Sequence, residues 1–285
     1  MSGTPPAPPL APAEDLIYSS ASELRRPARF LRDAIHDLAR SRAVAWQLFR
    51  TGMQARHRRA WLGYLWLVLP SIATTIVWVY VQRRGIVAVA TPRVPYPVYV
   101  LSGMVLWQVF TDALNAPLQQ LAAGKQIITR SRVPHEALLL AGAIEVFANC
   151  AVRLTVLAAV LVAFRVPLAP TAALVPLGIV ALAILGLALG LFAAPAGMLY
   201  DDVARAIAIV TSFWFFLTPI IYRMPAAGLL RLNPVTPLLD TTRSWLLSGP
   251  AASGFAAVTL VSSAALLVAW LFHRLARPHL IARLG

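Results

Sequence analysis

Long apolar stretches separated by short polar segments dominate this chain. Six of them are long enough to cross a hydrocarbon core of about 30 Å, which takes roughly 20 helical residues. Only a few residues around Pro167 and Pro170 separate the third stretch from the fourth, so these two should form a helical hairpin. The pattern predicts an all-α polytopic membrane protein with six transmembrane helices, at residues 61–81, 98–116, 137–164, 171–194, 204–222 and 254–272.

The segments outside these stretches divide the rest of the chain. Residues 1–22 are rich in Pro and Ala and are expected to form a disordered N-terminal tail rather than a signal peptide. Residues 23–60 are rich in Arg and carry Trp46, Phe49 and Met53 at helical spacing, which predicts a helix lying at the membrane interface. Residues 61–272 would form the transmembrane domain, and residues 273–285 a basic cytosolic tail.

Composition agrees with a bilayer environment, since 59% of the residues are hydrophobic and only 13% are charged. The net charge of +14 comes from residues between the apolar stretches, which indicates topology and attraction to anionic lipid rather than nucleic acid. With both termini cytosolic, seventeen basic residues lie inside and seven outside. The charge distribution therefore predicts cytosolic N and C termini, although Arg83 and Arg84 go against the rule.

The sequence shows no motif for catalysis or energy conversion. No phosphate-binding G-x-x-x-x-G-K-[ST] loop occurs, since Gly124–Lys125 is the only Gly-Lys pair and lacks the upstream glycine. If ATP drives transport, the ATPase is therefore another polypeptide, which would bind the ATP and Mg. The five histidines are not paired with cysteines or carboxylates at metal-ligand spacing. We expect no cofactor or metal in this chain, and no enzyme activity of its own.

Few charged residues lie inside the predicted spans. Glu145 and Arg153 lie eight residues apart on the third span, about 12 Å along a helix, so they cannot pair within it. They either line a polar path or proton relay, or each bonds to a neighbouring helix. Asp112 is predicted near the cytosolic end of its span, where its side chain should reach the membrane interface. Gly186 and Gly190 form a G-x-x-x-G face, interpreted as packing within the bundle.

Aromatic and arginine side chains are the candidate substrate ligands. Aromatic rings can stack on sugar rings without one fixed hydrogen-bond pattern, which suits a sliding polymer, although rings at span ends also form interfacial belts. Arginine forks match phosphate oxygens, so arginines before the first span could hold a lipid-linked phosphate or simply anchor the helix. The candidates are Trp66, Trp78, Trp107, Phe110, Phe213, Phe216 and Tyr222 for a channel, and Arg56, Arg58 and Arg59 for lipid phosphate.

Six short stretches, in this order and at these spacings, carry a family resemblance. They are LGYLW at 62–66, YPVYVLSG at 96–103, QIITRSRVPHE at 126–136, YDDV at 200–203, TPIIY at 218–222 and LNPVTP at 232–237. Together they resemble the permease subunit of the ABC-2 type polysaccharide and polyol-phosphate exporters, the family that serves O-antigen, capsule and teichoic acid export. The resemblance covers most of the chain, from about residue 46 to 249.

The resemblance implies how the chain would work. It implies a homodimer of six-span permeases in the bacterial inner membrane, with two copies of a separate ATPase and a lipid-linked polysaccharide as substrate. It further implies external re-entrant helices between residues 223 and 250. The ATPase coupling segment would comprise Arg130, Arg132, Val133, Pro134, His135 and Glu136. The alternatives are an ABC exporter of drugs or small lipids, and a proton-coupled secondary transporter built around Glu145 and Arg153.

Overall fold

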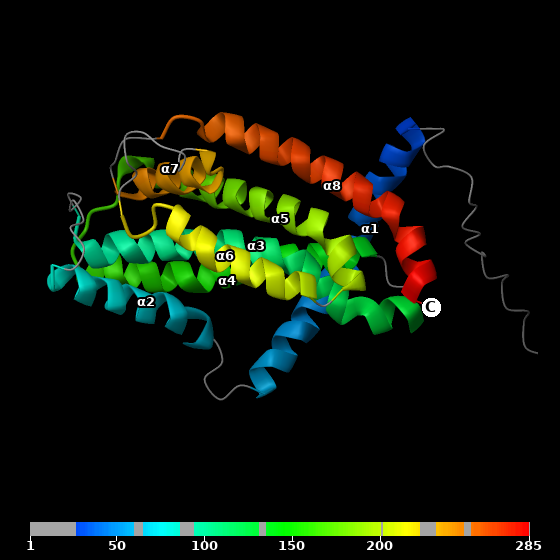
Figure 1. Ribbon diagram of the computed structural model, residues 1–285, viewed down its shortest axis with the longest axis horizontal. Helices are drawn as coiled ribbons and strands as arrows, with labels where there is room; N and C mark the ends of the chain where they lie inside the picture. The colour runs from blue at the N-terminus through cyan, green and yellow to red at the C-terminus, as the bar shows by residue number, and fades with distance from the viewer. Residues whose placement is uncertain are drawn as a thin grey trace, which may run out of the picture.

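The computed structural model describes residues 27–59, 65–85, 94–130, 135–200, 202–222, 232–247 and 252–284, which form a bundle of helices with no strand among them (Figure 1). The all-α prediction is confirmed. The elements are α1 Pro27–Arg59, α2 Leu65–Arg83, α3 Tyr96–Arg130, α4 His135–Ala163, the 3₁₀ helix η2 Pro170–Leu174, α5 Val175–Leu199, α6 Asp202–Leu217, α7 Val235–Leu247 and α8 Phe255–Leu284.

Five of the six expected spans are present as helices long and apolar enough to cross a membrane. They are α2, the first part of α3, α4, η2 with α5, and α8, among the described residues. The fifth predicted stretch, 204–222, differs, because α6 ends at Leu217 and residues 218–222 bend away. Pro219 lacks an N–H and stops the helix there. With 16 residues, α6 is about 24 Å long, so the sixth crossing stays a prediction.

The long helices run alternately in opposite directions, which gives the bundle two distinct ends (Figure 1). One end, called here the α1 end, carries α1 and the last part of α8. The opposite end, called the α7 end, carries α7 and the turn between α4 and α5. The chain reverses direction at this short turn, as predicted, but α4 and α5 both pack on α3 rather than on each other, so the prediction of a packed helical hairpin is wrong. The predicted C-terminal tail instead continues α8 as a helix to Leu284.

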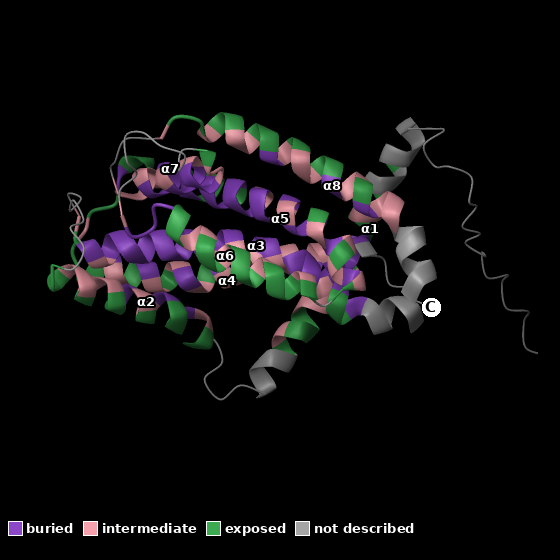
Figure 2. Ribbon diagram, viewed as in Figure 1, coloured by how far each residue is buried: buried purple, intermediate pink, exposed green. Residues whose placement is uncertain are grey.

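Helix α3 is the centre of the bundle and packs against both α4 and α5 (Figure 2). Most of its apolar part is buried, whereas only a small share of α2 and α8 is. The glycines of α5 allow the close approach to α3: a Cβ at Gly190 would lie 2.2 Å from the Leu114 carbonyl oxygen, and one at Gly186 would lie 2.5 Å from that of Phe110. The G-x-x-x-G face therefore serves packing within the bundle, as predicted.

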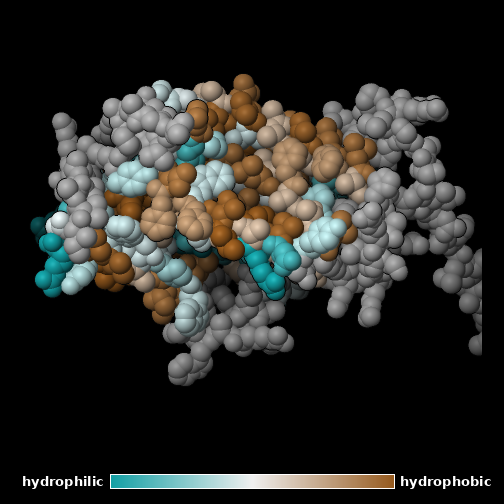
Figure 3. Space-filling view, viewed as in Figure 1, coloured by the Kyte–Doolittle hydropathy of each residue, from teal (hydrophilic) through white to brown (hydrophobic). Residues whose placement is uncertain are grey.

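Helices α2 and α6 lie at the periphery and pack less extensively on the bundle than α4 and α5 pack on α3. No residue of α6 is buried. Figure 3 shows hydrophobic side chains covering most of the described surface on the face that α6 occupies. Such a large exposed apolar surface is expected where lipid or another subunit covers it.

Candidate functional site

The two faces of α6 have different roles in this subunit. Phe213 and Phe216 point out of the bundle and are 68% and 57% exposed. Trp214 and Phe215, between them in sequence, point inward and pack against the core. Trp66 of α2 is also exposed, at 60%. Three of the seven candidate channel residues, Trp66, Phe213 and Phe216, are therefore available to a ligand on the surface of this chain.

Trp107 and Phe110 of α3 are placed differently, since they are only 4% and 0% exposed. The Trp107 ring lies 6.0 Å from that of Phe215, and the Phe110 ring lies 5.3 Å from that of Trp214, both edge to face. These rings hold the inner face of α6 against α3. Within one subunit they reach no open surface, so their burial favours a packing role over channel lining.

Trp78 and Tyr222, the remaining channel candidates, are half-buried against the main core. Tyr222 lies at the end of the segment that follows α6, and its hydroxyl donates to the Phe216 carbonyl 2.9 Å away. Its own carbonyl accepts a hydrogen bond from Tyr99 at 3.0 Å. Tyr222 is thereby tied to both α6 and α3.

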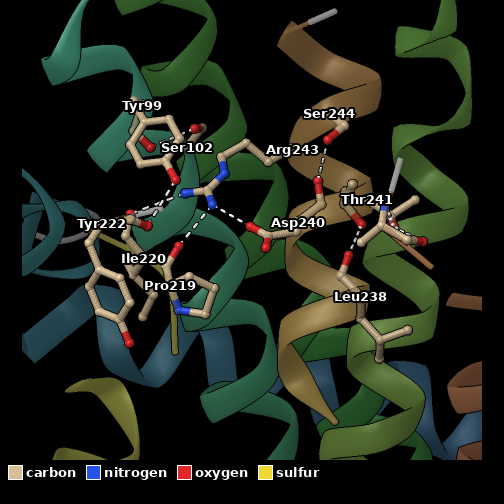
Figure 4. Close-up of polar contacts among 12 residues, drawn as sticks. Tyr99, Ser102, Pro219, Ile220, Tyr222, Leu238, Asp240, Thr241, Arg243 and Ser244 are labelled. Atoms are coloured by element: carbon tan, nitrogen blue, oxygen red, sulfur yellow. Dashed lines mark hydrogen bonds and ion pairs between the residues drawn. The ribbon is translucent and has the colours of Figure 1, made fainter. Parts of the chain in front are cut away.

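The segment that follows α6 enters the bundle at the α7 end with an irregular backbone. Thr218 and Ile220 are fully buried, and they follow the last residue of α6, so the carbonyls of this segment lie outside the regular hydrogen bonding of the helix. Arg243 of α7 supplies the donors: its guanidinium donates to the carbonyls of Pro219 at 2.8 Å and Ile220 at 3.1 Å (Figure 4). Buried backbone groups must find such partners, especially where water is scarce.

Arg243 is itself held on three sides. Its side chain is 6% exposed, it pairs with Asp240 one turn earlier, and its guanidinium lies 3.9 Å from the centre of the Tyr99 ring. Burial raises the pKa of the Asp240 carboxyl, and the Arg243 guanidinium opposes that shift. A Cβ on Gly103 would lie 2.9 Å from the Ile220 oxygen and 3.1 Å from an Arg243 nitrogen, so this close approach needs a glycine.

Three of the sequence motifs meet at this point. The motif YPVYVLSG at 96–103 supplies the Tyr96 hydroxyl, which donates to the Ile221 carbonyl at 3.1 Å. From the last motif, Asn233 accepts from Trp214 at 3.0 Å and donates to the Thr218 hydroxyl at 2.9 Å. We call the set Tyr96, Tyr99, residues 218–222, Asn233, Asp240 and Arg243 the α6 anchor. Neither Arg243 nor Asp240 belongs to one of the six sequence motifs. An Asp and an Arg three residues apart on a short helix could nevertheless have suggested an ion pair between them.

The charged residues within the spans bond to neighbouring helices. Arg153 of α4 donates to Asp112 of α3 at 2.5 Å, and both are largely buried. Asp112 thus lies inside the bundle, and the expectation that it reaches the membrane interface is wrong. The side-chain amide of Gln120 donates to Glu145 at 3.0 Å. The interpretation of Glu145 and Arg153 as helix-packing groups is therefore the one these contacts favour.

At the α1 end, one arginine joins three helices. Arg274 of α8 donates to Asp37 of α1 at 2.7 Å, and its second nitrogen lies 3.5 Å from the Glu136 carboxylate at the start of α4. Glu136 is 5% exposed. A direct contact between Glu136 and an ATPase is therefore disfavoured, because its carboxylate is already held within the chain.

The other candidate site residues lie where side chains are not described. Arg56, Arg58 and Arg59 are in the last turns of α1, Arg130 ends α3, and His135 begins α4. Arg132, Val133 and Pro134 lie outside the described residues. Among the described residues, no group of three or more His, Cys, Asp or Glu side chains gathers that could hold a metal ion.

Fold and site together define a class: a polytopic helical membrane protein in which Asp112, Glu145 and Arg153 bond between helices of the bundle, and in which α2 and α6 expose aromatic side chains. No family model matches the chain. The chain is 22% identical over 224 residues to the O-antigen export system permease protein RfbA of Myxococcus xanthus, an alignment that covers 73% of this chain and 81% of the relative. This similarity confirms the resemblance to polysaccharide export permeases.

Proposed function

We propose that this chain is the permease subunit of an ATP-driven exporter that moves a lipid-linked polysaccharide from the cytosol to the outer side of the bacterial inner membrane. The observation that carries the proposal is the similarity to an O-antigen export permease over most of both chains. The α6 anchor supports it, since three of the motifs behind the family resemblance converge there on one network of contacts.

The proposal places the α1 end in the cytosol. Arg56, Arg58 and Arg59 end α1 and lie just before α2 in sequence, so they would meet the lipid phosphate as the substrate enters. Two copies of a separate ATPase would bind ATP and Mg and act at this end through residues 130–136. The Arg274 contacts would then make α1, α4 and α8 respond together.

A homodimer would provide the channel. The exposed face of α6 with Phe213 and Phe216, and Trp66 of α2, lie on the weakly packed helices, where another subunit could cover them. Aromatic faces can hold successive sugar rings while the chain slides. In this arrangement α2 and α6 are the helices free to move, because they pack weakly whereas α4 and α5 both pack tightly on α3.

The test is purification of the protein from its own cell membrane, followed by identification of co-purifying proteins and an ATPase assay. We expect an ATPase subunit to co-purify, and the lipid-linked polymer to raise its turnover. In cells, Phe213→Ala with Phe216→Ala should reduce surface polymer while the complex still assembles. Stimulation by drugs or short lipids in place of polymer would support a different exporter class, and transport by the chain alone would contradict the proposal.

A further inference from the structure

The α7 end of α2 carries an arginine pair that the proposed transport does not use. Arg83 is the last residue of α2 and Arg84 follows it, and both are exposed. The sequence holds no Asp or Glu between residues 38 and 111. No carboxylate on this helix or its flanks can therefore neutralise the pair. Figure 3 shows a hydrophilic patch at this end of α2, beside the apolar surface.

The Arg84 side chain is already oriented. Its Nε donates to the Tyr80 hydroxyl at 3.1 Å, and its guanidinium carbon lies 5.2 Å from the centre of the Tyr80 ring. Fixing Nε leaves the two terminal nitrogens as donors for another group. A planar fork held in this way matches two oxygens of a phosphate.

The surface next to the pair indicates what carries the phosphate. Ile76 and Val77, one to two turns before Arg83, are 63% and 57% exposed, and Tyr80 is 56% exposed. These side chains form a continuous apolar face that ends at the arginines. α2 has 19 residues and is about 28 Å long, so Arg83 and Arg84 fall at headgroup depth when α2 spans the membrane. A ligand with acyl chains along α2 and an anionic head fits this surface.

A second cationic group lies on the neighbouring helix. Arg165 follows the end of α4, which packs beside α2, and it is exposed with a φ of 52°. It occupies the left-handed position of a helix-ending motif, in which the Val166 N–H donates to the Leu161 carbonyl at 3.0 Å. Glycine would hold this conformation without strain, so arginine is not there for backbone reasons. Between residues 146 and 200 the sequence again has no Asp or Glu.

We infer that Arg83 and Arg84, with the Tyr80 ring, form a binding site for the phosphate headgroup of an anionic phospholipid at the α7 end of the bundle. The negative end of the α2 helix dipole favours a cation there. That effect does not explain two exposed arginines beside an exposed apolar surface. The bound lipid would hold α2 at a fixed depth. The inference is independent of the transported substrate, because it rests on α2 and its surroundings alone.

The test uses the full-length protein in phosphatidylcholine nanodiscs that contain a small share of phosphatidylglycerol. Phosphatidylglycerol retained after extraction is counted by native mass spectrometry, and its affinity is measured by titration. Arg83→Gln with Arg84→Gln should weaken binding by about fivefold for each arginine removed. Tyr80→Phe, which keeps the charge but removes the hydroxyl that orients Arg84, should weaken it less. Arg205→Gln, at an exposed arginine at the start of α6, should leave binding unchanged.

Two results would overturn the inference. Equal phosphatidylglycerol retention by the wild-type protein and the double variant would show that the pair is not the site. Displacement of the lipid by glycerophosphoglycerol, which has the headgroup without acyl chains, or by a soluble anionic polysaccharide would show that the site takes free phosphate or polymer instead. Equal thermal stability of the variants is checked first, so that a loss of binding is not a loss of fold.

Discussion

Removing Arg243 should release the end of α6 from the bundle. In Arg243→Met the carbonyls of Pro219 and Ile220 lose their donor, and the largely buried Asp240 carboxylate loses its counter-charge. A buried group left without a partner costs about 1–3 kcal/mol, and breaking a buried ion pair costs about 3–5 kcal/mol. Asp240 keeps some contact with solvent, since 21% of its side chain is exposed, so we expect a total at the lower end of the two costs combined, about 4 kcal/mol.

The chain contains its own reporter for this measurement. Cys150 is the only cysteine and is 2% exposed in the core. A dye that fluoresces on reaction with a thiol therefore reports unfolding at one known position during a temperature ramp in detergent. A loss of about 4 kcal/mol should lower the apparent Tm by about 10 °C.

The partner variant distinguishes a lost interaction from general damage. Arg243→Met combined with Asp240→Leu removes both charges, and replacing a whole buried pair by apolar groups is far less costly than breaking it. The double variant should recover about half of the decrease in Tm caused by Arg243→Met. Arg205→Met removes one partner of an exposed ion pair with Asp202 and should leave Tm almost unchanged. The reasoning is refuted if Arg243→Met unfolds within about 2 °C of wild type, or if the two substitutions simply add.

Other substitutions test the remaining contacts. Glu145→Gln should leave ATP-dependent polymer export nearly intact, because the Gln120 amide can rotate to bond a neutral amide; loss of export would favour a proton relay. Gly190→Ala should destabilise the protein by about 1–3 kcal/mol or more, because the new Cβ would clash with Leu114. Gly52→Ala is the control and should not destabilise it, since nothing lies within 4 Å of a Cβ there. The same thiol-dye assay measures both variants. Arg274→Gln should uncouple α8 from α1 and α4 and lower the yield of complex with the ATPase more than it lowers Tm. A normal yield would contradict the role of Arg274 in joining the helices.

Apolar length and periodicity predict most of the spans, because a membrane helix must satisfy its backbone internally. The turn at Pro167 and Pro170 and the packing face at Gly186 and Gly190 follow from the same reasoning, whereas the packing of α4 and α5 on α3 rather than on each other does not. The early end of α6 does not, since the apolar run continues to Tyr222 and only Pro219 marks the stop. Where the chain leaves the helix, its course depends on partners such as Arg243 that lie more than twenty residues away.

The candidate site was less predictable for a similar reason. The sequence places Trp107, Phe110, Phe213 and Phe216 on apolar helices, but it does not show which face of each helix packs against the core. Two of them are buried and two are exposed, because α3 is surrounded by neighbours and α6 is not. Asp112 was misplaced because its partner, Arg153, is on another helix, and contact across helices is not visible from spacing along one.

The position of α3 has a consequence for how the protein enters the membrane during synthesis. Of the five apolar helices it has the lowest mean hydropathy and the largest buried share, and it brings Asp112 and Gln120 with it. When α3 emerges from the ribosome alone, its insertion into lipid should be unfavourable. Its polar groups are matched by Arg153 and Glu145 on α4, the next helix to be made, so these two helices should leave the translocon as a pair.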